Sequence, residues 1–401
     1  MPAGNASIPR ESRPRSLGGQ ALGSWGWRAL RSLVWRRVPR AMRQAVLRVA
    51  VGGGRAPLAQ GAAAAQPVCV IGLLSTPTGI GEGGRLAARA LAALGHEVLS
   101  VDVSDLMTGR APAAQLAPPL EIGPGTAILH FNPDNLPAIL SLLGRERLRG
   151  KRIVGYWAWE LPRIPEAWIL ALDEVDEVWT PSRFVAAAVR PFTAKPVRVV
   201  PHPTALGPAG RARRAEFGIG AEFTVLTMFS FGSFARKNPV AALGAFRRAF
   251  GDAPDRRLIL KSVGGAQAPA QMRALRRAVD GAANVAIDDR VLGERERLDL
   301  IDDATALTVP FRLVAADPRD ANGRGIWAEP DVAAAATHLA ALAAEPGRFA
   351  VLRGAARERA RRRLGLRAFG RALEAAGLAA PGHSCRSASI GFKEAARRAG
   401  K

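Results

Sequence analysis

The sequence is poor in several residue types, and each scarcity excludes a class of protein. Two cysteines in 401 residues, Cys69 and Cys385, are too few for a disulfide framework or a cysteine-rich metal cluster. Tyr156 is the only tyrosine, and lysine supplies six of the 57 basic residues. No run of about 18 apolar residues lacks a charge, so we expect no membrane span. The first residues also lack the apolar core of a signal peptide.

Positive charge, in contrast, is abundant and uneven. The formal net charge is +23, and residues 1–66 hold eleven arginines and one acidic residue. In this leader, apolar residues recur three and four apart from Trp25 until Pro39 interrupts the pattern. A basic amphipathic helix with tryptophans is typical of contact with an anionic membrane surface. The alternatives are a helix that packs on the folded chain and a partly disordered leader.

The order of apolar runs, turns and helical patterns predicts an α/β protein with four parts. We expect a basic amphipathic leader and linker over 1–66, and an N-terminal Rossmann-like domain over 67–205. A second Rossmann-like domain with closing helices is expected over 206–378, followed by a disordered tail over 379–401.

A glycine-rich turn follows the first expected strand, Val68–Leu74, and precedes a helical pattern over Arg85–Leu94. Asp102 comes about 20 residues after the turn, the spacing of the acidic residue in dinucleotide-binding folds. The glycines do not match G-x-G-x-x-G, so a tight strand-to-helix turn and a nucleotide site both remain open. The glycines are Gly79, Gly81, Gly83 and Gly84.

Three later stretches of the N-terminal half also place polar or aromatic residues at strand ends. His130 ends a strand expected over Thr126–Asn132, and His202 follows the strand of the segment VRVVPHP. Between them, Trp159 and Glu160 lie in a loop after the strand that begins at Lys151. An aromatic face can pack against a sugar ring, and a carboxylate can accept hydroxyl hydrogen bonds. The alternative is that these side chains pack locally.

The second half repeats the pattern with cations in place of aromatics. After a strand expected over Phe223–Phe231, Ser233, Arg236 and Lys237 precede a helical pattern over Val240–Phe250, and Lys261 lies near the end of the next strand. Small residues and cations at a helix N-terminus suit a diphosphate. Solvated basic side chains are the alternative.

Together these segments carry a resemblance to a known family. GYWAWELPRIPEAW, DEVWTPSRFVAAAV, VPHP, FSFGSFARKNPVAALGAFRRAF and LILK, in this order, resemble bacterial glycosyltransferases of family 4 (group 1), which have the GT-B architecture. The likeness covers about residues 67 to 378. It implies two Rossmann-like doubly wound domains that face a cleft, with the nucleotide-sugar bound mainly to the second domain.

The resemblance also implies roles for the candidate residues. Arg236, Lys237, Ser233 and Lys261 would bind the donor diphosphate. The acceptor side would be lined by Gly79, Gly81, Glu82, His130, Trp159, Glu160 and His202. No metal or other cofactor would be obligatory, since no Asp-x-Asp site stands in a suitable loop.

The sequence departs from the family in its second half. The family has two acids seven residues apart around a glycine-rich loop, and this motif is missing here. Short strands are expected over Asn284–Ile287 and Ala306–Val309, but the strand and helix that the family has between them are absent, so we expect a second domain shortened near 298–303. Glu329 is expected to cap the following helix rather than to supply the missing acid.

Three functions remain open from the sequence. The first is a glycosyltransferase that acts, with retention, on a lipid-linked or polysaccharide acceptor. The second is a catalytically impaired GT-B-like protein that binds an acceptor or a partner, and the third is a basic nucleic-acid-binding protein. The first implies a cytoplasmic protein of the bacterial cell envelope pathway, in peripheral contact with the inner face of the membrane if the leader binds there.

Overall fold

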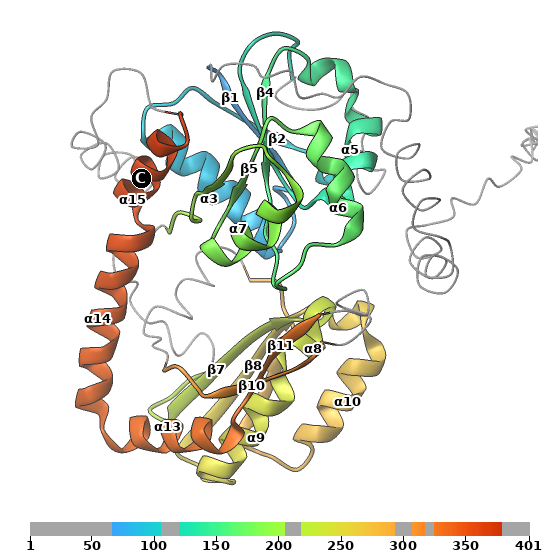
Figure 1. Cartoon of the computed structure of the whole chain (residues 1–401). Helices are drawn as coiled ribbons and strands as arrows, with labels where there is room; N and C mark the ends of the chain where they lie inside the picture. The colour runs from blue at the N-terminus through green and yellow to red at the C-terminus, as the bar shows by residue number, and fades with distance from the viewer. Residues whose placement is uncertain (1–65, 106–119, 205–217, 293–306, 317–324, 379–401) are drawn as a thin grey trace, which may run out of the picture. The chain divides into compact units, whose positions relative to one another are not determined.

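The computed structural model describes residues 66–105, 120–204, 218–292, 307–316 and 325–378 (Figure 1). The leader, the tail and the segment 298–303 lie outside these residues, so the predictions for them stay predictions. Within the described ranges, no helix has both the length and the apolar character needed to cross a bilayer.

The first half of the described chain forms a six-stranded sheet in the order β2-β1-β3-β4-β5-β6, with every neighbouring pair parallel. The chain moves from β1 to β2 and then returns to the other side of β1 with β3. In such open sheets, ligands bind outside the carboxyl ends of the two strands where the direction reverses. The strands are β1 Val68–Gly72, β2 Val98–Asp102, β3 Thr126–His130, β4 Arg152–Tyr156, β5 Glu177–Thr180 and β6 Val197–Val199.

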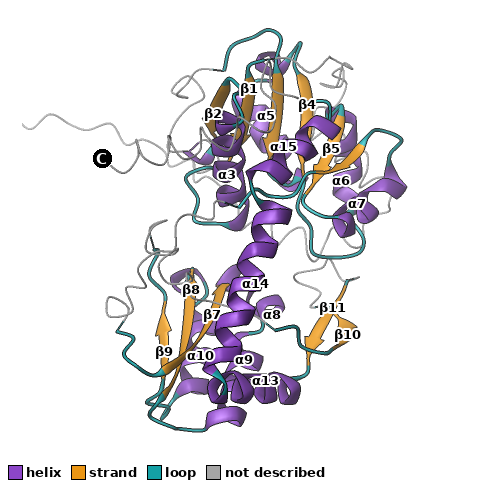
Figure 2. Ribbon diagram, turned by 90° about the vertical axis from the view of Figure 1, so that its left-hand side faces the viewer, coloured by secondary structure: helices purple, strands orange, loops and turns teal. Residues whose placement is uncertain are grey.

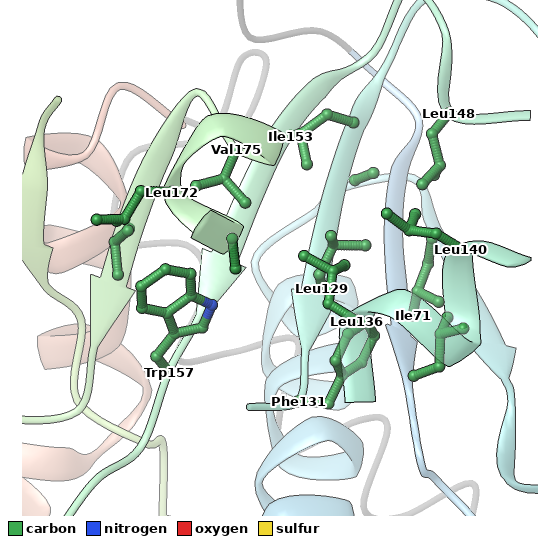
Figure 3. Packing of buried hydrophobic residues seen from close by; sticks show 14 of the residues in the cluster. Ile71, Leu129, Phe131, Leu136, Leu140, Leu148, Ile153, Trp157, Leu172 and Val175 are labelled. Carbon is green, nitrogen blue, oxygen red and sulfur yellow. The ribbon is translucent and has the colours of Figure 1, made fainter. Parts of the chain in front are cut away.

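Helices cover both faces of this sheet, which confirms the predicted Rossmann-like α/β class. α3 and α15 pack on one face, and α5, α6 and α7 pack on the other. Figure 3 shows the second face, where Trp157 and Leu140 lie beside strand residues such as Leu129. The helices are α3 Gly79–Ala93, α5 Leu136–Leu143, α6 Glu166–Ala171, α7 Arg183–Val189 and α15 Leu366–Ala375.

The first helix begins earlier than the sequence predicts. Thr78 caps α3 by accepting a hydrogen bond from the Gly81 amide, so the glycine-rich stretch forms the first turn of the helix rather than a loop before it. Ser182 caps α7 by accepting from the Val185 amide.

A buried charge network holds the C-terminal helix α15 on the first sheet. Glu177, 3% exposed, accepts hydrogen bonds from Arg152 at 2.6 Å and from Arg198 at 2.9 Å. The two arginines in turn donate to the carbonyls of Ala376 and Ala375, at 2.7 Å and 3.0 Å. The carbonyls at the end of a helix lack partners within it, so the arginines supply the C-cap of α15.

The second half contains a shorter parallel sheet, in the order β7-β8-β9 (Figure 2). Helices α9 and α10 pack on one face through a core that includes Phe246, Leu258 and Leu275. The shortening predicted near 298–303 lies outside the described residues and stays a prediction. The elements are β7 Phe223–Ser230, α8 Phe234–Lys237, α9 Pro239–Phe250, β8 Arg256–Val263, α10 Pro269–Val279 and β9 Val285–Asp288.

Two predictions for the remaining segment are wrong. Residues 307–309 carry no regular structure, and the strand lies later, in an antiparallel hairpin of β10 Phe311–Ala315 and β11 Ile326–Pro330. Glu329 lies in β11 and accepts a hydrogen bond from the Asn238 side chain at 3.1 Å. Asp331 caps the next helix instead, because it directly precedes Val332 and its carboxylate accepts from the amides of Ala333 and Ala334. The closing helices are α13 Val332–Ala344 and α14 Pro346–Leu364.

Candidate functional site

The glycine-rich segment and His130 lie together at the switch point of the first sheet. Gly72, the last residue of β1, is directly opposite His130, the last residue of β3. The sequence placed both at strand ends, and the parallel register brings these two ends side by side.

The loop after β1 is held by Asp102, at the end of β2. One carboxylate oxygen accepts from the Leu74 amide at 2.9 Å and from the Ser104 hydroxyl at 2.6 Å, and the other accepts from the Ser75 hydroxyl. Burial raises the pKa of the Asp102 carboxyl, but the hydrogen bonds from Ser104, Ser75 and Leu74 outweigh burial and lower it. These contacts favour the tight-turn interpretation of the glycine-rich segment over a dinucleotide site.

Arg85 of α3 holds the same loop from the other side. Its guanidinium donates to the carbonyls of Leu74 and Thr76 and forms an ion pair with Glu82 at 2.7 Å. The carboxylate of Glu82, an acceptor-side candidate, thus orients Arg85. Asp102 and Arg85 together fix the loop between β1 and α3.

We expect Asp102→Asn to lower the free energy of unfolding by about 1–2 kcal/mol, because an amide NH₂ would replace one of the accepting oxygens. Urea unfolding measures the loss. Asp173→Asn is the control, since Asp173 is exposed on the same half of the chain and should change stability by less than about 0.5 kcal/mol. Equal losses in both variants would contradict a role for Asp102 in holding the loop.

Two glycines of α3 are required by close contacts. A Cβ at Gly81 would lie 2.6 Å from the carbonyl oxygens of both Leu73 and Thr76. A Cβ at Gly83 would lie 2.6 Å from the His202 ring and 2.9 Å from the His130 ring. Gly79, at the first position of the helix, is exposed and has open space around it.

The two histidines form a buried aromatic cluster with Tyr156. The His130 ring stacks on Tyr156 with centroids 4.4 Å apart, and His202 lies 5.6 Å from His130 and 5.0 Å from Tyr156. The Tyr156 hydroxyl donates to the Val200 carbonyl at 2.7 Å. Within the described residues, neither ring nitrogen of His130 has a hydrogen-bond partner, and this side chain is 1% exposed.

Burial, followed by the charge of His202, lowers the pKa of His130 to about 3. Burial also lowers the pKa of His202. Both rings are therefore neutral at physiological pH, each with a lone pair that can accept a hydrogen bond. The sequence indicated the two histidines but missed Tyr156, whose contacts with them depend on residues far apart in the chain.

The aromatic and acidic loop after β4 is partly exposed. Trp157 is buried, whereas Trp159 is half-buried and donates its indole N–H to the Arg163 carbonyl at 2.7 Å. Glu160 is half-exposed and forms an ion pair with Arg236 at 2.9 Å. This contact joins a residue predicted for the acceptor side to one predicted for the donor side.

On the second sheet, the predicted donor residues follow the carboxyl end of β7. Ser233 lies in the turn that follows β7, Arg236 and Lys237 end α8, and Lys237 is exposed. Asn238 comes next, with a left-handed φ of 46°, and its side chain caps α9. Lys237 therefore stands directly before a helix N-terminus, although it belongs to the preceding turn of helix.

Lys261 is placed differently from the sequence prediction. It is 4% exposed, and its ammonium group donates to the carbonyls of Ser262, Asp288 and Arg290. All three N–H donors face the protein, and Asp288 lies 3.7 Å away. In this arrangement Lys261 links β8 to the end of β9.

The described residues contain no cluster of three or more side chains suited to a metal ion.

Comparisons with known proteins add little at this point. No protein-family model matches the chain, and no curated protein matches it. A "Glycosylation Associate Protein (Gap123) complex" from Streptococcus agalactiae aligns at 14% identity and a TM-score of 0.28, over 45% of this chain and 37% of that one. The pneumococcal O-GlcNAc transferase GtfA aligns at 10% identity and a TM-score of 0.38, over 67% of this chain and 57% of that one.

The third structure, apo OtsA, aligns at 11% identity and a TM-score of 0.31, over 55% of each chain. The alignments thus span less than two thirds of the length of each of these proteins. Similarity this weak decides nothing about activity, so the functional conclusion rests on the residues of this chain.

Proposed function

We propose that this protein transfers a sugar from a nucleotide-diphosphate sugar to a lipid-linked or polysaccharide acceptor, with retention of the anomeric configuration. The proposal rests on the ordered sequence resemblance and on two sheets whose candidate residues follow the carboxyl ends of strands. The observation that carries it is the position of Lys237. It is an exposed cation beyond the end of β7, directly before the N-terminus of the twelve-residue helix α9.

This position suits a diphosphate for two physical reasons. The N-terminus of a helix carries partial positive charge and free amide donors. A mobile lysine adds a full positive charge, which stabilises the leaving diphosphate as negative charge develops on it. In the proposal, Lys237, Ser233 and Arg236 bind the diphosphate, and the acceptor approaches from Gly79 and Trp159, which are at least partly exposed.

We expect Lys237→Ala to weaken the binding of a UDP- or GDP-linked hexose at least tenfold, because a charged hydrogen bond contributes about 1.5–3 kcal/mol. Isothermal calorimetry with each nucleotide-sugar measures the affinity. Arg276→Ala is the matched control, since it removes an exposed cation from α10 and should leave the affinity unchanged. Unchanged binding in Lys237→Ala would contradict the role of this residue.

A second function, binding without turnover, is favoured by the missing pair of acids. An assay for release of nucleoside diphosphate from the donor separates the two. Release that depends on an acceptor would establish transfer. Tight donor binding with no release, across a panel of lipid-linked and polysaccharide acceptors, would support the binding protein.

A further inference from the structure

Helix α14 is polar and exposed along its described length. It joins α13, which packs against α9, to α15, which packs on the first sheet (Figure 1). None of its described side chains is buried. A helix that is polar on every side gains little from packing, so its stability depends on its charges and their partners.

The charge of α14 is strongly positive toward its C-terminal end. The helix contains seven arginines and one acidic residue, Glu358, which pairs with Arg362 at 3.5 Å. Arg359, Arg361 and Arg363 are exposed, and none of the three has an ion-pair partner among the residues that the structure describes. Over residues 359–373 the sequence holds six arginines and no acid.

This concentration of charge is unfavourable for the helix alone. The negative end of the helix dipole stabilises cations in the last turn. Arginines four residues apart, such as Arg359 and Arg363, nevertheless repel each other on one side of the helix. A partner that carries many negative charges would remove this repulsion.

Most of the chain outside the described ranges does not offer such a partner. Residues 1–66 hold eleven arginines and one acid, and residues 379–401 hold five basic residues and one acid. The segment 293–306 is the exception, with five acids and two arginines. It is the competing occupant that an experiment has to exclude.

An anionic phospholipid surface fits α14 better than a nucleic acid does. Both ends of the helix continue into packed helices, so a partner meets its side, as a flat surface can. The sequence from Leu352 to Leu364 has no aromatic residue for base stacking and no amide or hydroxyl side chain for base edges. Its arginines are suited to phosphate groups, which they bind through paired hydrogen bonds.

We propose that α14 binds side-on to the phosphates of an anionic membrane through Arg359, Arg361, Arg362 and Arg363. The choice of a lipid surface rests on the proposed function, because a lipid-linked acceptor lies at such a surface. Since α14 has no continuous apolar face, it adsorbs by charge without inserting, and salt weakens the binding.

Cosedimentation of the full chain with vesicles tests the proposal, without nucleotide-sugar or acceptor. Vesicles of about 30% phosphatidylglycerol in phosphatidylcholine supply the anionic surface. Each arginine near such a surface contributes a factor of about five in affinity. We therefore expect Arg359→Glu, Arg361→Glu and Arg363→Glu, combined in one chain, to weaken binding at least tenfold. Circular dichroism checks that this chain is folded.

The matched control makes the same change of charge on α10. Arg273→Glu, Arg276→Glu and Arg277→Glu replace three exposed arginines and should leave vesicle affinity within about twofold of the unaltered chain. Equal losses in the two variants would overturn the proposal, because net charge or the leader would then account for binding. No loss in the α14 variant would also overturn it, as expected if the segment 293–306 covers the helix.

A nucleic acid is tested with a DNA duplex at the same phosphate concentration and salt. Tighter binding of the duplex than of the vesicles, lost in the α14 variant and kept in the α10 variant, would overturn the choice of a lipid surface.

Chemical labelling of the unaltered chain needs no substitution. Phosphatidylglycerol vesicles should slow the modification of Arg359, Arg361 and Arg363 by phenylglyoxal, measured by mass spectrometry, and leave Arg276 unaffected. Equal protection of both helices, or of neither, would overturn the proposal. The vesicles carry no sugar, so failure here leaves the donor-binding test of Lys237 standing, and failure of that test leaves vesicle binding measurable.

Discussion

Glu177→Ala is expected to lower the free energy of unfolding by about 3–5 kcal/mol, the cost of leaving a buried charge without its partner. Glu177 bonds Arg152, Arg198 and the Trp179 indole, at 2.6, 2.9 and 2.6 Å. Removal of the carboxylate leaves Arg152, 8% exposed, as an uncompensated cation. The two arginines also cap α15, so we expect this helix to loosen with them. Urea unfolding followed by tryptophan fluorescence measures the loss.

An exposed ion pair supplies the control for this substitution. Glu358 of α14 pairs with Arg362 at 3.5 Å, with both side chains at least half-exposed. Because solvent screens such a pair, Glu358→Ala should cost less than about 0.5 kcal/mol. A loss below about 1 kcal/mol in Glu177→Ala would show that water replaces the carboxylate and that the network does not hold α15.

The stability of the protein is expected to fall as the pH is lowered from 6.5, at about 1.4 kcal/mol per pH unit for each histidine that titrates only in the unfolded chain. Burial lowers the pKa of His130 to about 3, whereas an unfolded histidine takes up its proton near 6.5. The unfolded state therefore binds more protons across this window. The contribution of the neutral, buried His130 to the free energy of unfolding is fully present above pH 6.5 and is lost as the pH falls toward 3.

The measurement is a series of urea titrations between pH 7.5 and pH 5, above the range in which ordinary carboxylates titrate. His130→Phe retains a ring against Tyr156 but removes the titrating group, so its stability should depend less on pH. Tyr156→Phe is the control. It loses the hydrogen bond to the Val200 carbonyl, which should lower the free energy of unfolding by about 1 kcal/mol at every pH. Its stability should depend on pH as strongly as that of the unaltered protein. Equal slopes in all three proteins would contradict a neutral, buried His130.

Much of the fold could be predicted because strands of parallel sheets are short apolar runs that end at Gly, Pro or polar residues. β1, β3, β7 and β9 begin within about one residue of their predicted positions. The start of α3 was wrong because glycine favours turns, and nothing local shows that Gly81 and Gly83 are needed where a loop and two rings approach the helix.

The candidate sites depend more on contacts between distant parts of the chain, which a single sequence does not show. A lysine at a strand end is usually solvated, yet Lys261 is buried because three carbonyls at the ends of β8 and β9 converge on it. Glu329 was expected at a helix start, but the hairpin pairing of Arg312 with Glu329 places this residue in a strand. The position of Lys237 before a helix could be predicted from the sequence, because it depends only on residues close to it in the chain.

The position of α15 has a consequence for synthesis of the chain. One face of the first sheet is completed by Phe369, Leu373, Ala376 and Leu378, which are translated about 170 residues after β6. While the ribosome is still making the second sheet, Val154 and Trp179 lack part of their final apolar cover. The first sheet therefore reaches its full stability only after residue 378 leaves the ribosome, and until then part of this apolar face is exposed to solvent.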